Sequence, residues 1–107
     1  MTPQEFFKKD LFAENAGVVL LEVREGYSKA KLEIKPEHLN AGARTQGGAI
    51  FTLADLALAA AANSHGTLAF SLSSSITFLR ASGPGDRLVR YSFASSSSQT
   101  GHSSHAV

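Results

Sequence analysis

The chain contains no cysteine, and its 107 residues carry ten basic and nine acidic side chains. Without cysteine there are no disulfides and no thiolate chemistry, which fits a reducing compartment. A formal net charge of +1 gives no long-range attraction to nucleic acid or to an anionic membrane. The N-terminus, MTPQEFFKKD, lacks the basic head and apolar core of a signal peptide. We therefore expect a cytoplasmic protein with no nucleic-acid and no membrane partner.

Charged side chains are nearly missing from the middle of the chain. Asp55 is the only Asp, Glu, Lys or Arg between Arg44 and Arg80. Around it, residues 48–63 have apolar side chains at helical spacing, and alanines fill much of the remaining circumference. We expect a helix that is buried on nearly all sides and wrapped by a curved sheet. A carboxylate there loses hydration, which raises its pKa and is common at reactive sites; a structural hydrogen-bonding role is about equally well supported.

The other elements are shorter and alternate with turn residues. Together they indicate one α+β domain, with a mainly antiparallel sheet packed against one long helix. We assign residues 1–94 to this domain and expect the serine-rich tail, 95–107, to be disordered. In chain order the predicted elements are a helix over 3–14, an apolar strand over 18–24, a turn at 25–26, an alternating strand ended by Pro36, a long strand over 68–79 and a strand of about eight residues from Arg87.

Two glycines, Gly47 and Gly48, lie where the long helix begins. Unpaired N–H groups at a helix start can bind an anion or a polarised carbonyl oxygen, although the glycines alone would equally serve a turn. Asp55 lies eight residues beyond Gly47, roughly 12 Å along the axis at the helical rise per residue. One small reacting group cannot touch both. If both serve one substrate, the second must come from another copy of the chain, as in a dimer with two equivalent sites.

Other kinds of site lack their sequence patterns. The four histidines show no convincing metal-binding spacing, so we expect no metal site. No G-x-S-x-G elbow and no G-x-x-x-x-G-K phosphate loop occurs, which argues against a serine hydrolase and a nucleotide-dependent enzyme. We also expect no cofactor.

Residues 38–86 contain, in order, the motifs HLN, QGG, LAD, NSHG, FLR and PGD. Their order and spacing resemble the core of the hotdog-fold acyl-CoA thioesterases, in the branch of phenylacetyl-CoA-type enzymes. The resemblance implies a long central helix wrapped by an antiparallel sheet, in a homodimer or a dimer of dimers with sites between subunits. It also implies hydrolysis of an acyl-CoA thioester to the free acid and CoA.

The same resemblance assigns roles to individual residues. Asp55 falls on the family's catalytic acid, which acts as general base or nucleophile. Gly47 falls on the residue whose N–H polarises the thioester carbonyl, with Gly48 beside it at the substrate. Asn40 matches a residue that orients water or substrate, and Ser71 a small polar residue near the acid; without the resemblance, a turn-forming asparagine and a sheet-face serine are the simpler interpretations.

The chain departs from the family in two places. Gln46, which we expect to contact substrate, replaces the usual histidine before the double glycine; it can donate and accept hydrogen bonds but cannot be cationic. After Leu88 the family continues through further long strands, whereas this chain turns into the serine-rich tail. The sequence thus reads as a truncated hotdog domain lacking its last strands. The alternative to a thioesterase is a catalytically impaired or non-catalytic hotdog module that binds an acyl ligand or a partner chain.

Overall fold

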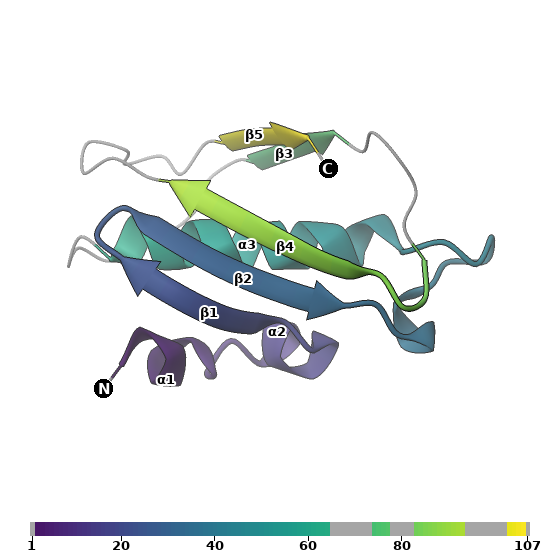
Figure 1. Ribbon diagram of the computed structural model, residues 1–107, viewed down its shortest axis with the longest axis horizontal. Helices are drawn as coiled ribbons and strands as arrows, with labels where there is room; N and C mark the ends of the chain where they lie inside the picture. The colour runs from purple at the N-terminus through teal and green to yellow at the C-terminus, as the bar shows by residue number, and fades with distance from the viewer. Residues whose placement is uncertain (1, 65–73, 78–82, 94–102, 107) are drawn as a thin grey trace.

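The computed structural model describes residues 2–64, 74–77, 83–93 and 103–106. Strands β1, β2 and β4 form an antiparallel sheet in that order, and α3 packs against one of its faces (Figure 1). This confirms the predicted central helix and antiparallel sheet. Within the described ranges, no helix is long and apolar enough to cross a bilayer. The elements are α1 (Pro3–Phe7), α2 (Leu11–Ala16), β1 (Val19–Arg24), β2 (Tyr27–Glu33), the 3-10 turn η1 (Pro36–His38), α3 (Gly47–Asn63), β3 (Ser74–Thr77), β4 (Arg87–Phe93) and β5 (Ser103–Ala106).

The N-terminal segment forms two short helices where one was predicted. Thr2 and Glu5 make the expected capping box at the start of α1. The helix then breaks, because the carboxylate of Asp10 accepts a hydrogen bond from the N–H of Ala13 at 3.2 Å and so starts α2. Gly17 ends α2 in the left-handed conformation, with φ 93°. After the break, α1 lies against β1 and α3, and α2 lies against α3.

The first two strands form the predicted hairpin, with its turn at Glu25 and Gly26. Along β2, every second side chain is buried against α3, namely Ser28, Ala30 and Leu32. The intervening lysines lie on the other face, as the alternation predicted. The hairpin therefore supplies one side of the hydrophobic core.

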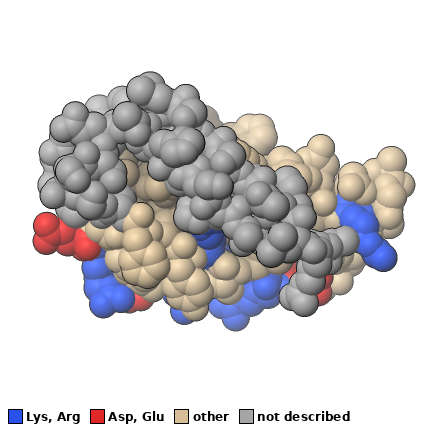
Figure 2. Space-filling view, turned by 90° about the horizontal axis from the view of Figure 1, so that it is seen from above, with Lys and Arg blue, Asp and Glu red and all other residues tan. Residues whose placement is uncertain are grey.

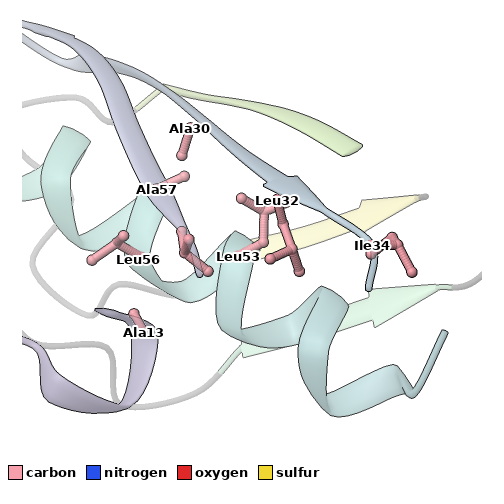
Figure 3. Packing of buried hydrophobic residues seen from close by; sticks show 8 residues of the cluster. Ala13, Ala30, Leu32, Ile34, Leu53, Leu56 and Ala57 are labelled. Atoms are coloured by element: carbon pink, nitrogen blue, oxygen red, sulfur yellow. The ribbon is translucent and has the colours of Figure 1, made fainter. Parts of the chain in front are cut away.

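Small side chains let the sheet and α3 approach closely. Ala30 on β2 and Ala57 on α3 have no exposed surface, and both belong to the core cluster shown in Figure 3. The hydroxyl of Ser28 donates a hydrogen bond to the carbonyl oxygen of Ala57, so this polar group is satisfied inside the interface. The remaining members of the cluster are Ala13, Val18, Leu32, Ile34, Leu53 and Leu56.

One face of α3 is open, so the prediction that this helix is buried on nearly all sides is wrong for the single chain. Gly48 and Asp55 are exposed, and Thr52, Ala59 and Ala62 are partly exposed. These positions follow one another at spacings of three and four residues and so form one line along the helix. The sheet covers only the opposite face.

The C-terminal half differs from the sequence predictions in its strands. Only residues 74–77 of the predicted long strand at 68–79 are described as a strand, and the others lie outside the described residues. Strand β5 lies inside the serine-rich tail, for which we predicted no regular structure, and pairs in parallel with β3. Backbone pairing needs no particular side-chain pattern, which is why the serine-rich sequence gave no sign of this strand.

Strand β4 brings a cation into the interior. Arg90 pairs with Ala30 on the face that packs on α3 and is 8% exposed. Among the described residues, its Nε and Nη2 atoms have no hydrogen-bond partner, and neither does the buried hydroxyl of Ser92 two residues on. Burial lowers the pKa of Arg90. The other basic side chains visible in Figure 2 are spread along one edge beside acidic ones, without forming a single patch.

Candidate functional site

The start of α3 is shaped by Gln46 and two glycines. The side-chain oxygen of Gln46 accepts a hydrogen bond from the N–H of Gly48, which makes Gln46 the N-cap of the helix. A Cβ on Gly48 would lie 2.8 Å from that oxygen, so a larger residue there would require the Gln46 side chain to move and would disturb the cap. Gln46 was predicted to contact substrate, and that stays a prediction; in the structure its side-chain oxygen is used to cap α3.

Gly47 keeps an unused donor at this helix start. Among the described residues, no group accepts a hydrogen bond from its backbone N–H. The next two N–H groups are occupied, because Gly48 donates to the Gln46 side chain and Ala49 to the Gln46 carbonyl at 2.9 Å. The positive end of the helix dipole thus coincides with one open donor.

Asn40 organises the loop that leads to this donor. Its side-chain oxygen accepts hydrogen bonds from the N–H groups of Gly42 at 2.9 Å and Arg44 at 3.2 Å. These bonds flank Ala43, whose φ of 60° is costly for a residue with a Cβ. The turn-forming role is therefore real, but it uses only the oxygen. The side-chain NH2 of this exposed residue donates to no described group.

His38 joins this loop to α2, a role the sequence analysis missed. Its imidazole is buried; Nδ1 accepts from the N–H of Lys35 at 2.9 Å, so Nε2 carries the proton and donates to the carbonyl oxygen of Ala16 at 2.6 Å. The HLN motif marked the residue, but its partner is 22 positions away and no local pattern indicates such a pairing. His38 therefore fixes the end of α2 beside the loop that precedes α3.

A cleft of about 550 Å³ opens between these elements. From α2, Phe12, Asn15 and Ala16 line it. Phe12 is 75% exposed, an unusual state for a large aromatic side chain. The sequence analysis did not identify Phe12, because its side chain does not belong to the apolar face of a predicted helix.

The opposite wall of the cleft comes from η1 and from the start of α3. It consists of Glu37, His38, Gln46, Gly48, Ala49 and Thr52. The residues on either side of Gly47 are both in this wall, so the open donor lies at the edge of the cleft.

Asp55 lies on the same open face of α3, about two turns beyond Gly48. Partial burial among the surrounding atoms raises its pKa, and the negative charge of Asp10 at the start of α2 raises it further. The carboxylate nevertheless remains exposed in the single chain. As the rise of the helix requires, one chain does not bring Asp55 and Gly47 to a common point.

The other predicted features add little to this picture. Ser71 lies outside the described residues. No group of three or more His, Cys, Asp or Glu side chains in the described ranges is arranged to hold a metal ion.

The family model described as the thioesterase superfamily matches residues 45–100, which is more than half of the sequence. The chain belongs to this superfamily. The matched region begins just before Gln46 and contains the whole of α3, so the open N–H of Gly47 and the carboxylate of Asp55 both lie within the family's shared core.

Individual relatives agree with this assignment. The chain is 47% identical over 83 residues to a protein of Archaeoglobus fulgidus that is provisionally named an esterase, covering 78% of this chain and 54% of that one. It is 33% identical to the acyl-coenzyme A thioesterase PaaI of Escherichia coli, again covering 78% of this chain and 59% of that one. The chain therefore spans a little over half the length of the curated relatives it matches.

Solved structures give the same fold. The Escherichia coli PaaI structure, from the phenylacetic acid degradation operon, superposes with a TM-score of 0.77 at 31% identity, covering 81% of this chain and 63% of that one. A hypothetical thioesterase of Streptococcus pneumoniae, solved with coenzyme A, has a TM-score of 0.69 at 28% identity, covering 78% and 67%. The architecture is thus a hotdog fold in which this chain supplies the central helix and part of the sheet.

Proposed function

We propose that the protein is an acyl-CoA thioesterase that hydrolyses its substrate to the free acid and CoA. One observation carries the proposal: the N–H of Gly47, at the start of a long helix and at the edge of a cleft, donates to no described group. A donor so placed stabilises the negative charge that develops on a thioester carbonyl oxygen during attack. The names of the thioesterase relatives and the coenzyme A in the Streptococcus pneumoniae structure support the same reaction.

Asp55 provides the attacking chemistry in this proposal. It acts either as a general base that takes a proton from water, or as a nucleophile that forms a mixed anhydride which water then opens. In both routes the carbonyl oxygen becomes negative, the C–S bond breaks and CoA leaves as the thiol. The raised pKa of Asp55 makes its carboxylate a stronger base than an ordinary aspartate.

The active unit is a homodimer, or a dimer of dimers, in which Gly47 of one subunit faces Asp55 of the other. The separation of roughly 12 Å along one helix keeps them from meeting within a chain. The exposure of Asp55 in the single chain leaves it available to such a partner. The free NH2 group of Asn40 can donate a second hydrogen bond to substrate or water near Gly47.

The test is thiol release from a panel of aryl and medium-chain acyl-CoA esters, using paired variants. Asp55→Asn should lower kcat/KM by about 100-fold or more, whereas Glu14→Gln, which neutralises an exposed carboxylate on α2, should change it little. Gly47→Pro removes the N–H and should keep the helix start, because proline is tolerated at the first helical position and Gln46 already has the extended backbone that precedes proline.

We expect Gly47→Pro to lose about 100-fold in kcat, and Gly47→Ala, which keeps the N–H, to lose much less. Equal rates for the wild type and Asp55→Asn would identify the turnover as background and contradict the catalytic assignment. Binding of acyl-CoA without any turnover would assign the chain to the non-catalytic alternative.

A further inference from the structure

Arg90 is the one Lys or Arg side chain that is buried in the described part of the chain. It is 8% exposed and lies on the α3-facing side of β4, opposite Ala30 of β2. No described group accepts a hydrogen bond from its Nε or Nη2. These two nitrogens form one edge of the planar guanidinium, and their N–H bonds match the two oxygens of a carboxylate. Arg90 therefore presents a complete carboxylate-binding edge that the described chain does not use.

Ser92 adds a third donor on the same face of β4. Side chains two residues apart on a strand point to the same side, about 7 Å apart along the strand. The Ser92 side chain has no exposed surface, and its hydroxyl bonds to no described group. Ser28, which pairs with Ser92 across the sheet, already donates its hydroxyl proton to the carbonyl oxygen of Ala57. Two neighbouring inward-facing side chains thus hold three unused donor atoms.

The chain has no acidic side chain to offer these donors. All nine Asp and Glu residues lie in the described ranges, and none of them is buried. Residues 56–85 and 87–107 contain neither Asp nor Glu, so the remaining parts of the sequence supply no carboxylate side chain. Burial lowers the pKa of Arg90, and no nearby negative charge opposes this effect. A partner for the guanidinium must therefore come from outside the chain.

The charge of the site selects the kind of anion. A buried cation is unfavourable unless it is paired and hydrogen-bonded. Since no second Lys or Arg is buried in the described ranges, a single negative charge neutralises the site. A carboxylate carries that charge, whereas a doubly charged sulfate or phosphate would leave a buried negative charge. In the three-stranded sheet, β4 is an edge strand, so Arg90 lies under the border of the sheet and not under its middle (Figure 1).

We propose that Arg90 and Ser92 form a binding site for a carboxylate that comes from outside the chain. The Nε and Nη2 edge of Arg90 binds the two carboxylate oxygens, and the Ser92 hydroxyl is the third donor. The carboxylate belongs to a small free acid or to an Asp or Glu side chain of a second copy of the protein. The site does not depend on the proposed thioesterase function, because Asp55 lies on the face of α3 that the sheet leaves open.

The first experiment tests a free acid. Thermal melts of the whole protein are recorded in sodium propionate, with sodium chloride and sodium sulfate at equal ionic strength as references. The proteins are the wild type, Arg90→Met, Arg90→Lys, Ser92→Ala and Arg87→Met. Arg87 is the matched control, because it is exposed on the same strand. Salt effects that the wild type shares with Arg90→Met are general effects on the protein surface and are subtracted.

At a concentration about ten times its Kd, propionate should raise the Tm of the wild type and of Arg87→Met by about 5 °C more than that of Arg90→Met. Arg90→Lys keeps the charge but lacks the two parallel donors, so we expect propionate to bind it at least about tenfold more weakly. Ser92→Ala should weaken binding about threefold to tenfold. The NMR resonance of the Arg90 Nε–H group should move along the same titration.

The second experiment tests a second copy as the source. Melts without added carboxylate are repeated over a hundredfold range of protein concentration. If the carboxylate belongs to another copy, the Tm of the wild type should rise with concentration more steeply than that of Arg90→Met, and the Arg90 Nε–H resonance should move with it. Propionate should then matter mainly in dilute protein, where it replaces the missing partner.

The proposal is overturned if the wild type and Arg90→Met respond alike in both experiments. It is also overturned if a response occurs without any movement of the Arg90 Nε–H resonance, since the anion would then bind elsewhere. An Arg90-dependent shift that is as large in sulfate as in propionate would contradict the choice of a carboxylate. Circular dichroism of each variant checks that the fold is retained.

Discussion

Asp55 and Asp10 are two carboxylates that the packing of α2 on α3 brings within electrostatic range. Asp10 is committed to capping α2 through its bond to the N–H of Ala13, whereas Asp55 makes no such bond. Its pKa is raised first by partial burial and then by the charge of Asp10. In the proposed reaction Asp55 must be ionised to act as base or nucleophile, so the charge of Asp10 helps to set the pH at which Asp55 can act.

We predict that kcat/KM falls as the pH is lowered through the pKa of Asp55, at a higher pH than for an ordinary aspartate. Asp10→Asn should move this acid limb to lower pH, because asparagine keeps the cap but removes the like charge. In Asp10→Asn the midpoint of the acid limb should still lie above the pKa of a free aspartate, because Asp55 remains partly buried. Full pH profiles of both proteins give the measurement.

Glu14→Gln is the control for this comparison, because it removes an exposed charge from α2 without touching the cap. If the acid limb shifts as far in Glu14→Gln as in Asp10→Asn, the pKa of Asp55 depends on the overall charge of α2 and not on Asp10 in particular. If the acid limb does not move in Asp10→Asn, the charge of Asp10 does not contribute to the raised pKa of Asp55.

At the scale of single elements, β4 contains the least favourable group in the described chain. The guanidinium of Arg90 is buried and two of its nitrogens bond to no described group, which costs free energy relative to an apolar residue of similar length. We predict that Arg90→Met raises the free energy of unfolding by about 1–3 kcal/mol. Urea denaturation followed by circular dichroism measures the change.

Arg87→Met is the matched control, because Arg87 is exposed on the same strand and should change stability by less than about 0.5 kcal/mol. A loss of stability in Arg90→Met would indicate that the cation has a partner when the protein is in solution.

The elements also show how far the sequence determines this structure. Alternation on β2 and helical spacing on α3 were sufficient to predict both elements, because each has a regular periodic face against the core. The open face of α3 was not predictable, since its alanines are equally compatible with burial. Contacts between distant segments were also missed, among them the bond from His38 to Ala16, the cleft wall at Phe12 and the pairing of β5 with β3.

The sequence also contributed to the proposed site. The spacing of Gly47 and Asp55 and the family motifs predicted the two positions, and the structure adds that no described group accepts a hydrogen bond from the N–H of Gly47. The role of Gln46 was not evident, because a glutamine before a glycine pair can face either the ligand or the helix. The structure shows that its oxygen caps α3 at the N–H of Gly48.

At the scale of the whole molecule, the proposed site is complete only when two chains meet. Asp55→Asn retains an intact Gly47, and Gly47→Pro retains an intact Asp55. In a mixed dimer of these two variants, one of the two sites contains both functional groups. Equal mixing should therefore restore about a quarter of the wild-type activity, because half of the dimers are mixed and each carries one working site.

Co-expression of the two variants, followed by thiol release, measures this recovery. Each variant expressed alone is the control, and sedimentation gives the mass of the assembly. Recovery no greater than the sum of the separate variants would contradict a site shared between subunits, as would a monomeric mass in an active sample.

The cap formed by Gln46 has a consequence for the timing of catalysis. Because the glutamine oxygen holds the first turn of α3 closed through the chain's own atoms, this turn can reach its final shape before any substrate arrives. In the proposed reaction the Gly47 amide is then preorganised, and an approaching carbonyl would meet a fixed dipole with no rearrangement of the backbone. Replacing a histidine by this neutral side chain would make the strength of that dipole insensitive to acidity near neutral pH.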